Sequence, residues 1–245
     1  MKYKDLADIA VEAGRKTLPD FRSEIETELK YPYDLVTETD RKIEQFIIDE
    51  IRKKDPDAVF HGEEYGKSGD ASGRFYIIDP VDGTANFVFG VPWYSVSIAL
   101  TENGSITAGV VYNPVSADLY YADMETPAML NGKRIQASER EKTDECLIIF
   151  GFTANRKSIA RYIDDWGDLF DNARKGLPLL SPSLNLCLVA QGKADAFIDF
   201  GCSMFGQSAG AYILQKAGGR VRNYTDDDYD FRKTGIIALN RKLCI

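Results

Sequence analysis

The chain has 245 residues and a formal net charge of −8, with 44% hydrophobic and 28% charged residues. This length suits one large or two closely packed domains, and the composition is ordinary for a soluble globular protein. The negative charge argues against a general nucleic-acid binder, because such a protein normally presents a basic face. No apolar run approaches the roughly 18–20 residues that a membrane helix needs, so no membrane partner is expected.

Cysteine and histidine usage narrows the chemistry further. The four cysteines are widely spaced and include no C-x-x-C pair, which indicates neither a zinc site nor a disulfide framework. The single histidine, His61, excludes a His-rich metal site. Free thiols and the lack of a signal-peptide core at the N-terminus predict a cytoplasmic protein.

Two helices are predicted near the N-terminus. Residues 5–18 carry apolar side chains on one helical face, which ends before Pro19. Thr37 and Asp40 have the spacing of a capping box, which predicts a second helix start. The apolar stripe of this second helix is formed by Ile43, Phe46, Ile47 and Ile51. A helix cap alone would explain Asp40.

The rest of the chain divides into two patterns. Residues 74–123 predict a largely antiparallel sheet, with strands at 74–78, 94–100, 106–111 and 119–122 and a further hairpin at Asn131-Gly132. After a charged break at 139–144, strands and helices alternate: strand 146–152, helices near 155–173 and 183–191, strand 194–200, helix near 206–217, and strands near 220 and 236. We therefore predict an N-terminal α+β half over residues 1–140 and a C-terminal α/β half over residues 141–245.

Residues 79–87, Asp-Pro-Val-Asp-Gly-Thr-Ala-Asn-Phe, form the most informative motif. A buried strand is predicted to end at Asp79, and Pro80 is expected to block further sheet pairing. If a short helix begins near Thr84, its N–H groups would bind an anion beside the two carboxylates. Because Mg²⁺ characteristically bridges protein carboxylates to phosphate oxygens, the motif suggests metal-assisted phosphate chemistry.

The same motif, taken alone, also fits a turn whose Asp side chains cap backbone N–H groups. Two further acidic clusters favour the metal site over that turn. They are His61-Gly62-Glu63-Glu64 and the stretch from Asp34 to Asp40, and each borders an apolar element. Three such clusters are hard to explain as three independent turns.

Together, the segments D-L-V-T-x-T-D, G-E-E and D-P-V-D-G-T-x-N-F resemble the inositol monophosphatase family of Mg²⁺-dependent phosphomonoesterases. The resemblance continues through Gly90-Val91-Pro92 and the Gly109–Pro114 stretch to Leu130-Asn131-Gly132-Lys133, and it is looser over residues 180–220. It implies a layered αβαβα sugar-phosphatase fold, with an N-terminal metal-binding half and a C-terminal substrate half. It also implies a homodimer.

The resemblance implies roles for the motif residues. Glu63, Asp79 and the Val81 carbonyl would bind a first Mg²⁺ ion, and Asp79 and Asp82 would bind a second; Mn²⁺ or Ca²⁺ would bind in the same places. Thr84, paired with Asp40, would activate the attacking water. Substrate contacts would come from the backbone N–H groups of Gly83 and Thr84 and from Ser181 and Asp199. Asn185 is a further polar candidate, and Glu64 would support the metal site.

Two departures from the family pattern concern the second metal and the substrate. The family signature W-D-x-A-A-G supplies another Asp ligand to the second metal, whereas this chain has Gly206 at that position. Where the family has G-[ST]-A-A, this chain has Leu180-Ser181-Pro182-Ser183, and Pro182 has no backbone N–H to donate. We therefore expect the second metal site to be empty or markedly weaker than the first.

The leading functional hypothesis is a Mg²⁺-dependent phosphomonoesterase that hydrolyses a small polyol or sugar phosphate, such as inositol monophosphate, by metal-activated water attack. The partner would be a small phosphorylated metabolite, and no nucleic acid polymer is expected. A fructose-1,6-bisphosphatase or a nucleotide phosphatase of the same superfamily stays open, although the compact loop at 67–73 favours small substrates. A catalytically impaired phosphate-binding or regulatory protein also stays open, because of Gly206.

Overall fold

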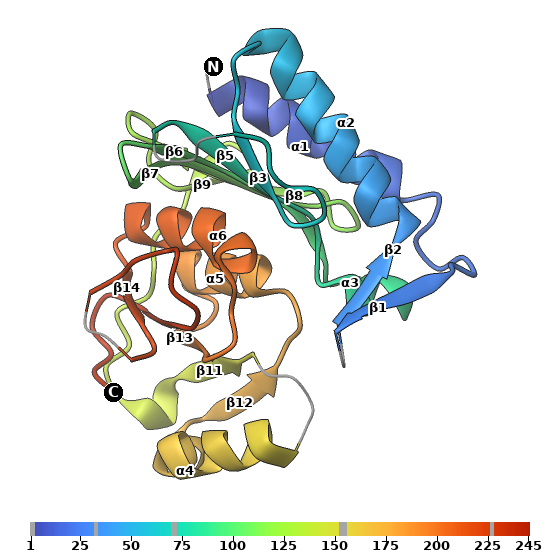
Figure 1. Ribbon diagram of the computed structural model, residues 1–245. Helices are drawn as coiled ribbons and strands as arrows, with labels where there is room; N and C mark the ends of the chain where they lie inside the picture. The colour runs from blue at the N-terminus through green and yellow to red at the C-terminus, as the bar shows by residue number, and fades with distance from the viewer. Residues whose placement is uncertain (1–2, 32–33, 70–72, 152–155, 226–227) are drawn as a thin grey trace.

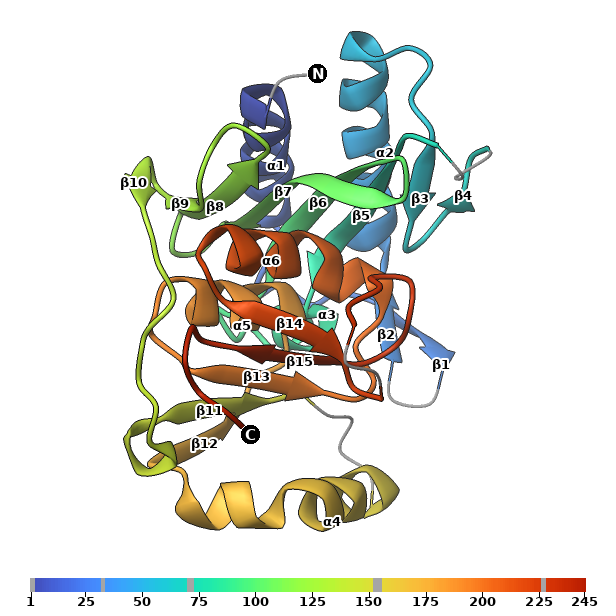
Figure 2. The same ribbon diagram turned by 90° about the vertical axis from the view of Figure 1, so that its left-hand side faces the viewer.

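The computed structural model describes residues 3–31, 34–69, 73–151, 156–225 and 228–245. Its elements stack in five layers, helix, sheet, helix, sheet and helix, as Figures 1 and 2 show. The layered αβαβα fold predicted from the sequence is confirmed. The three helical layers are α1 (Tyr3–Thr17) with α2 (Glu38–Lys54), then α5 (Pro182–Ala190) with α6 (Met204–Lys216), and finally α4 (Arg156–Asn172).

The first sheet has eight strands and belongs to the N-terminal half. Its order is β10 (Lys133–Arg134), β9 (Met129–Leu130), β8 (Asp118–Asp123), β7 (Ser105–Asn113), β6 (Ser95–Glu102), β5 (Phe75–Asp82), β3 (Phe60–Gly62) and β4 (Gly66–Lys67). All neighbours are antiparallel except β3 and β5, which are parallel. Apolar residues of α1 and α2 pack on one face of this sheet, so these two helices have a fully buried stripe each.

The second sheet has five strands and belongs to the C-terminal half. Its order is β12 (Lys175–Pro178), β11 (Leu147–Phe150), β13 (Ala196–Asp199), β15 (Ile236–Leu239) and β14 (Arg220–Asn223). β11 is parallel to β12 and β13, so the carboxyl ends of β11 and β13 meet at one edge. A short 3₁₀ helix at Thr143–Glu145 precedes β11.

The helices and strands expected from the sequence are present, with ends shifted by a few residues. Residues 152, 155 and 70–72, which belong to the expected strand 146–152, helix 155–173 and loop 67–73, lie outside the described residues. The features that were not predicted include the hairpin of β1 (Thr27–Tyr31) with β2 (Asp34–Thr37), the short strand β4 and the edge strand β12. The sequence of β12, Lys-Gly-Leu-Pro, lacks strand formers, and its Pro178 is tolerated because β12 is an edge strand.

The two halves share a hydrophobic core. The chain passes from the first sheet to the second between β10 and β11. One apolar cluster nevertheless joins strand residues such as Ile77 and Val111 to Leu186 of α5 and Ile213 of α6. The middle helical layer therefore closes the N-terminal sheet with residues of the C-terminal half. No helix among the described residues is both long and apolar enough to cross a bilayer.

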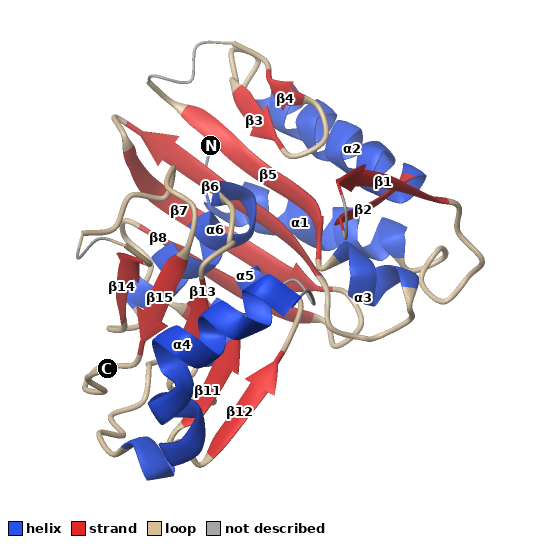
Figure 3. Cartoon of the chain, turned by 60° about the horizontal axis from the view of Figure 1, so that its bottom comes forward, coloured by secondary structure: helices blue, strands red, loops and turns tan. Residues whose placement is uncertain are grey.

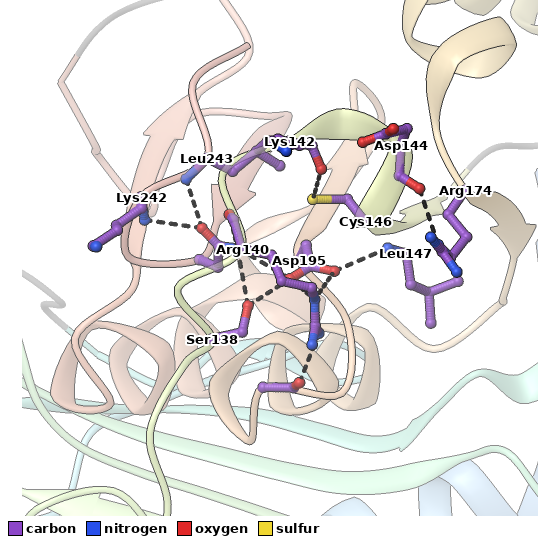
Figure 4. Close-up of polar contacts among 12 residues, drawn as sticks. Ser138, Arg140, Lys142, Asp144, Cys146, Leu147, Arg174, Asp195, Lys242 and Leu243 are labelled. Carbon is purple, nitrogen blue, oxygen red and sulfur yellow. Dashed lines mark hydrogen bonds and ion pairs between the residues drawn. The ribbon is translucent and has the colours of Figure 1, made fainter.

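The connection between the halves is attached through one buried carboxylate, that of Asp195 (Figure 4). Its oxygens accept hydrogen bonds from Ser138 Oγ, from Arg140 Nε at 2.9 Å, from the Leu147 N–H at 2.9 Å and from Asn240 Nδ2 at 3.0 Å. Burial would raise the pKa of Asp195, but these hydrogen bonds outweigh burial and hold the pKa below its usual value. Asp195 therefore joins the linker, β11 and the end of β15 at a single point.

Replacing Asp195 by alanine should lower the free energy of unfolding by about 3 kcal/mol, because it leaves several buried donors unpaired and Arg140 without its partner. Since the folded-state pKa is depressed, this stabilisation is present above about pH 4 in the wild type and is lost as the pH falls further. Urea denaturation at pH 7 measures the loss. Glu28→Ala, which removes only an exposed ion pair with Arg41, is the control and should leave the transition midpoint nearly unchanged. Equal midpoints for both variants would contradict the role of Asp195.

Candidate active site

The site is built around a bulge in β5. Asp79 pairs with Ser97 of β6 and Asp82 pairs with Ser95, so two residues of β5 lie between these pairs where β6 has one. Ser95 and Ser97 are two residues apart and share a face of the sheet, and the bulge therefore brings Asp79 and Asp82 to the same face. In a regular strand, residues three apart would point to opposite faces.

The bulge corrects one expectation. The sequence predicted that Pro80 would end the strand, but β5 continues to Asp82. Pro80 lies in the bulge, where the ladder requires no N–H from it. The lack of an N–H on Pro80 is therefore compatible with the bulge and does not terminate the sheet.

Asp82 is held through one of its oxygens. Its Oδ2 accepts hydrogen bonds from Ser181 Oγ, from Ser95 Oγ at 3.2 Å and from the Ser183 N–H at 3.1 Å. Burial raises the pKa of Asp82 to about 6, against the lowering effect of these donors. We call Ser95, Ser181 and the Ser183 N–H the Asp82 clamp. It fixes the carboxylate across the boundary between β5 and α5.

Asp40 makes the contacts of both alternatives that the sequence offered. Its Oδ2 accepts from the N–H of Thr37 at 2.9 Å and from Thr37 Oγ1, which completes the capping box of α2. Its Oδ1 lies 3.2 Å from Thr84 Oγ1, which is also 3.1 Å from the Val81 carbonyl oxygen. Burial raises the pKa of Asp40 to about 6, even though hydrogen bonds from Thr37 lower it. The Thr84–Asp40 pair expected from the resemblance is thus in contact.

Asp79 and Glu63 provide the chemistry of a cation site. Asp79 is 5% exposed, and its Oδ1 has no hydrogen-bond partner among the described residues. Burial, then the charges of neighbouring Glu63 and Asp82, raise the pKa of Asp79 well above its usual value. A buried carboxylate oxygen without a donor fits a divalent cation, which would replace the missing partner.

Across the described residues, no three His, Cys, Asp or Glu side chains converge into a ready-made metal cluster. A cation beside Asp79 would therefore depend on two carboxylates, Glu63 and Asp79, together with the Val81 carbonyl. This is the same ligand set that the resemblance implies for the first ion. A backbone carbonyl ligand is ordinary for a hard cation.

Glu44, a residue that no motif indicated, holds the backbone directly after Glu63. Glu44 is fully buried on α2 and accepts hydrogen bonds from the N–H groups of Glu64 at 2.8 Å and Tyr65 at 2.9 Å. A Cβ atom at Gly62 would lie 1.9 Å from Glu44 Oε1, so a larger residue there would displace the Glu44 carboxylate from its present position. One available signal was its position, four residues after Asp40 on the buried face of α2.

Gly83 links the motif to the loop before α5. It has a φ of 96° and precedes the short helix α3 (Thr84–Val88), which lies beside the β1–β2 hairpin (Figure 3). A Cβ atom on Gly83 would be 2.6 Å from the Leu180 carbonyl oxygen. Asn86 of α3 also donates to that oxygen, at 2.7 Å. These contacts, which sequence reasoning missed, fix the motif against the 180–183 segment.

The residues expected to contact substrate fall into two groups. Ser181 and Asn185 are fully buried; Ser181 donates to Asp82, and the Asn185 amide accepts from Trp93 and donates to the Leu179 carbonyl. Their side chains hold the framework, so direct substrate contact is not supported for them. Asp199, at the end of β13, is 8% exposed and its Oδ1 accepts from the Gly201 N–H at 2.8 Å. Burial raises the pKa of Asp199 to about 7.

A model of the family described as "Inositol monophosphatase family" matches residues 3–244. The chain belongs to the inositol monophosphatase family. It is 32% identical to human inositol monophosphatase 1 over 243 residues, which cover 96% of this chain and 88% of the relative. It is 36% identical to the Nus factor SuhB of Pseudomonas aeruginosa over 220 residues, covering 85% and 79%. The crystal structure of the extragenic suppressor protein suhB from Bartonella henselae matches with a TM-score of 0.90 and 33% identity, covering 97% and 92%.

The stability of this family member should depend on pH through its raised carboxyl pKa values. Asp40, Asp82 and Asp199 titrate near 6, 6 and 7 when folded, whereas unfolded Asp titrates near about 4. The folded state therefore binds protons more tightly, and the stability that these protons contribute is lost as the pH rises from about 4 to about 7. In EDTA, Asp199→Asn should remove part of this loss. Melting temperatures from pH 5 to 8 test it, and an unchanged slope in Asp199→Asn would contradict it.

Proposed function

We propose that the chain is a Mg²⁺-dependent phosphomonoesterase acting on a small polyol or sugar phosphate, with inositol monophosphate as the default substrate. The observation that carries the proposal is the buried, unpartnered Oδ1 of Asp79 beside Glu63. Membership of the inositol monophosphatase family supports the phosphatase class. A cation held by Glu63, Asp79 and the Val81 carbonyl would supply positive charge to the phosphate and acidify the attacking water.

Thr84 and Asp40 are suited to removing the proton of that water. Thr84 Oγ1 would accept the proton and pass its own to Asp40 Oδ1, which lies 3.2 Å away. A carboxyl group whose pKa is raised to about 6 by burial is a better proton acceptor near neutral pH than an ordinary Asp. The N–H groups of Gly83 and Thr84 would bind phosphate oxygens, and Asp199 would bind a substrate hydroxyl.

The proposal predicts Mg²⁺-dependent phosphate release from inositol 1-phosphate. Fructose 1,6-bisphosphate, adenosine 3′,5′-bisphosphate and NADP in the same assay distinguish the sibling activities. Asp79→Asn and Thr84→Ala should each lower kcat by about 100-fold or more, because they remove a cation ligand and the proton relay.

Two controls make the assay decisive. Thr84→Ser keeps the hydroxyl and should retain most activity, and Thr107→Ala removes a hydroxyl on β7 that donates only to the Leu100 carbonyl. No release from any substrate by folded protein would refute the phosphatase proposal. Equal kcat for Thr84→Ala and Thr107→Ala would refute the proton relay.

A regulatory protein with a retained phosphate pocket is the second candidate. Gly206 favours it, because the position that carries an Asp ligand in the family pattern has no side chain here. The similarity to a relative named Nus factor SuhB favours it too. The kcat of the wild type separates the two: a regulatory role requires binding of the phosphate ester with little or no turnover.

We also propose a homodimer. The sequence has two aromatic-rich segments, Phe87–Tyr94 and Tyr120-Tyr121. Phe87, Tyr94 and Tyr120 are buried in the core, whereas Phe89 and Val91 are 78% and 44% exposed. An apolar pair of this kind is suited to burial across a two-fold axis. Light scattering at micromolar concentration should give twice the mass of the chain, and Phe89→Glu should shift it towards the monomer. A monomeric wild type would rule out the dimer.

A further inference from the structure

Gly206 lies against the one oxygen of Asp82 that the Asp82 clamp leaves open. Gly206 belongs to the first turn of α6 and is buried. A Cβ atom built on it would lie 3.3 Å from Asp82 Oδ1. A carboxylate at position 206 would therefore lie next to Asp82 Oδ1, as a second ligand of a shared cation would.

Pro182 crowds the space that such a side chain would need. Its Cβ and Cγ lie 3.1 and 3.2 Å from the same built Cβ position. Unstrained carbon–carbon contacts are about 3.5–4.0 Å, so any side chain at position 206 would press on the proline ring. Because the ring is rigid and begins α5, it has little freedom to move aside.

The residues on either side of Pro182 hold Asp82 without a cation. Ser181 Oγ and the Ser183 N–H both donate to Asp82 Oδ2. Ser183 Oγ donates in turn to the Gly206 carbonyl at 3.0 Å, which ties α5 to α6 at this position. The segment 181–183 thus supplies donors to Asp82 and blocks position 206 at once.

We propose that Pro182 and Gly206 together close the second cation site. The Asp82 clamp then stabilises the Asp82 carboxylate by hydrogen bonds in place of a cation. This inference rests on the first cation site of the proposed function. The chain then binds one divalent cation tightly, through Glu63, Asp79 and the Val81 carbonyl. Recovering the second site requires two changes, because Gly206→Asp alone meets the Pro182 ring and the Asp82 carboxylate.

Isothermal titration with Mn²⁺ tests the proposal without reference to turnover. The wild type and Pro182→Ala should each bind one ion tightly, with any second ion bound at least about 100-fold more weakly. Gly206→Asp should gain little, and Pro182→Ala/Gly206→Asp should bind two ions tightly. Adding Glu63→Gln to the double variant should weaken the first ion and keep the second, which assigns the new site.

Gly206→Asn and Pro182→Ala/Gly206→Asn are the matched controls, since they add the same bulk without the charge and should bind no second ion. Circular dichroism and melting temperatures establish that each variant is folded. Two equally tight ions in the wild type would overturn the proposal, and so would a folded double variant that still binds one. Absence of phosphate release would refute the proposed function but not this inference, whereas absence of any tight ion in the wild type would refute both.

Discussion

The bulge in β5 is the constraint on which the site depends. It adds one residue between Asp79 and Asp82 relative to β6, and so turns two carboxylates three residues apart towards one face. Pro80 makes this irregularity inexpensive, because it has no N–H to lose from the ladder. Without the bulge, Asp82 would point away from the serines of the Asp82 clamp, and no pair of carboxylates would exist.

The buried carboxylates are stabilised by donors, with one exception. Asp40 accepts hydrogen bonds from Thr37 and Thr84, and Glu44 accepts them from two backbone N–H groups. Asp82 accepts hydrogen bonds from the Asp82 clamp. Such hydrogen bonds offset part of the desolvation cost of each buried group. Asp79 Oδ1 differs, because the described residues offer it no donor. This contrast marks Asp79 Oδ1 as the point at which the proposed cation would complete the site.

The features set by neighbouring residues could be predicted from the sequence, whereas the contacts between residues far apart in the chain could not. Most elements followed from apolar periodicity, and the residues of the candidate site followed from the resemblance of their motifs to the family. The bulge escaped prediction because proline usually marks a strand end. The use of Ser181 could not be foreseen, since its direction depends on Asp82, 99 residues earlier. Glu44 was missed because a charged residue in a helix is usually solvated.

The shared core has a consequence for how the chain acquires its site. The carboxylates of the N-terminal half lie on a sheet face that α5 and α6 cover, and these helices come from beyond residue 181. During synthesis the apolar face of the first sheet therefore stays uncovered until more than three quarters of the chain has left the ribosome. A nascent or truncated chain therefore has the acidic motif without the site, and its exposed sheet is a ready target for chaperones.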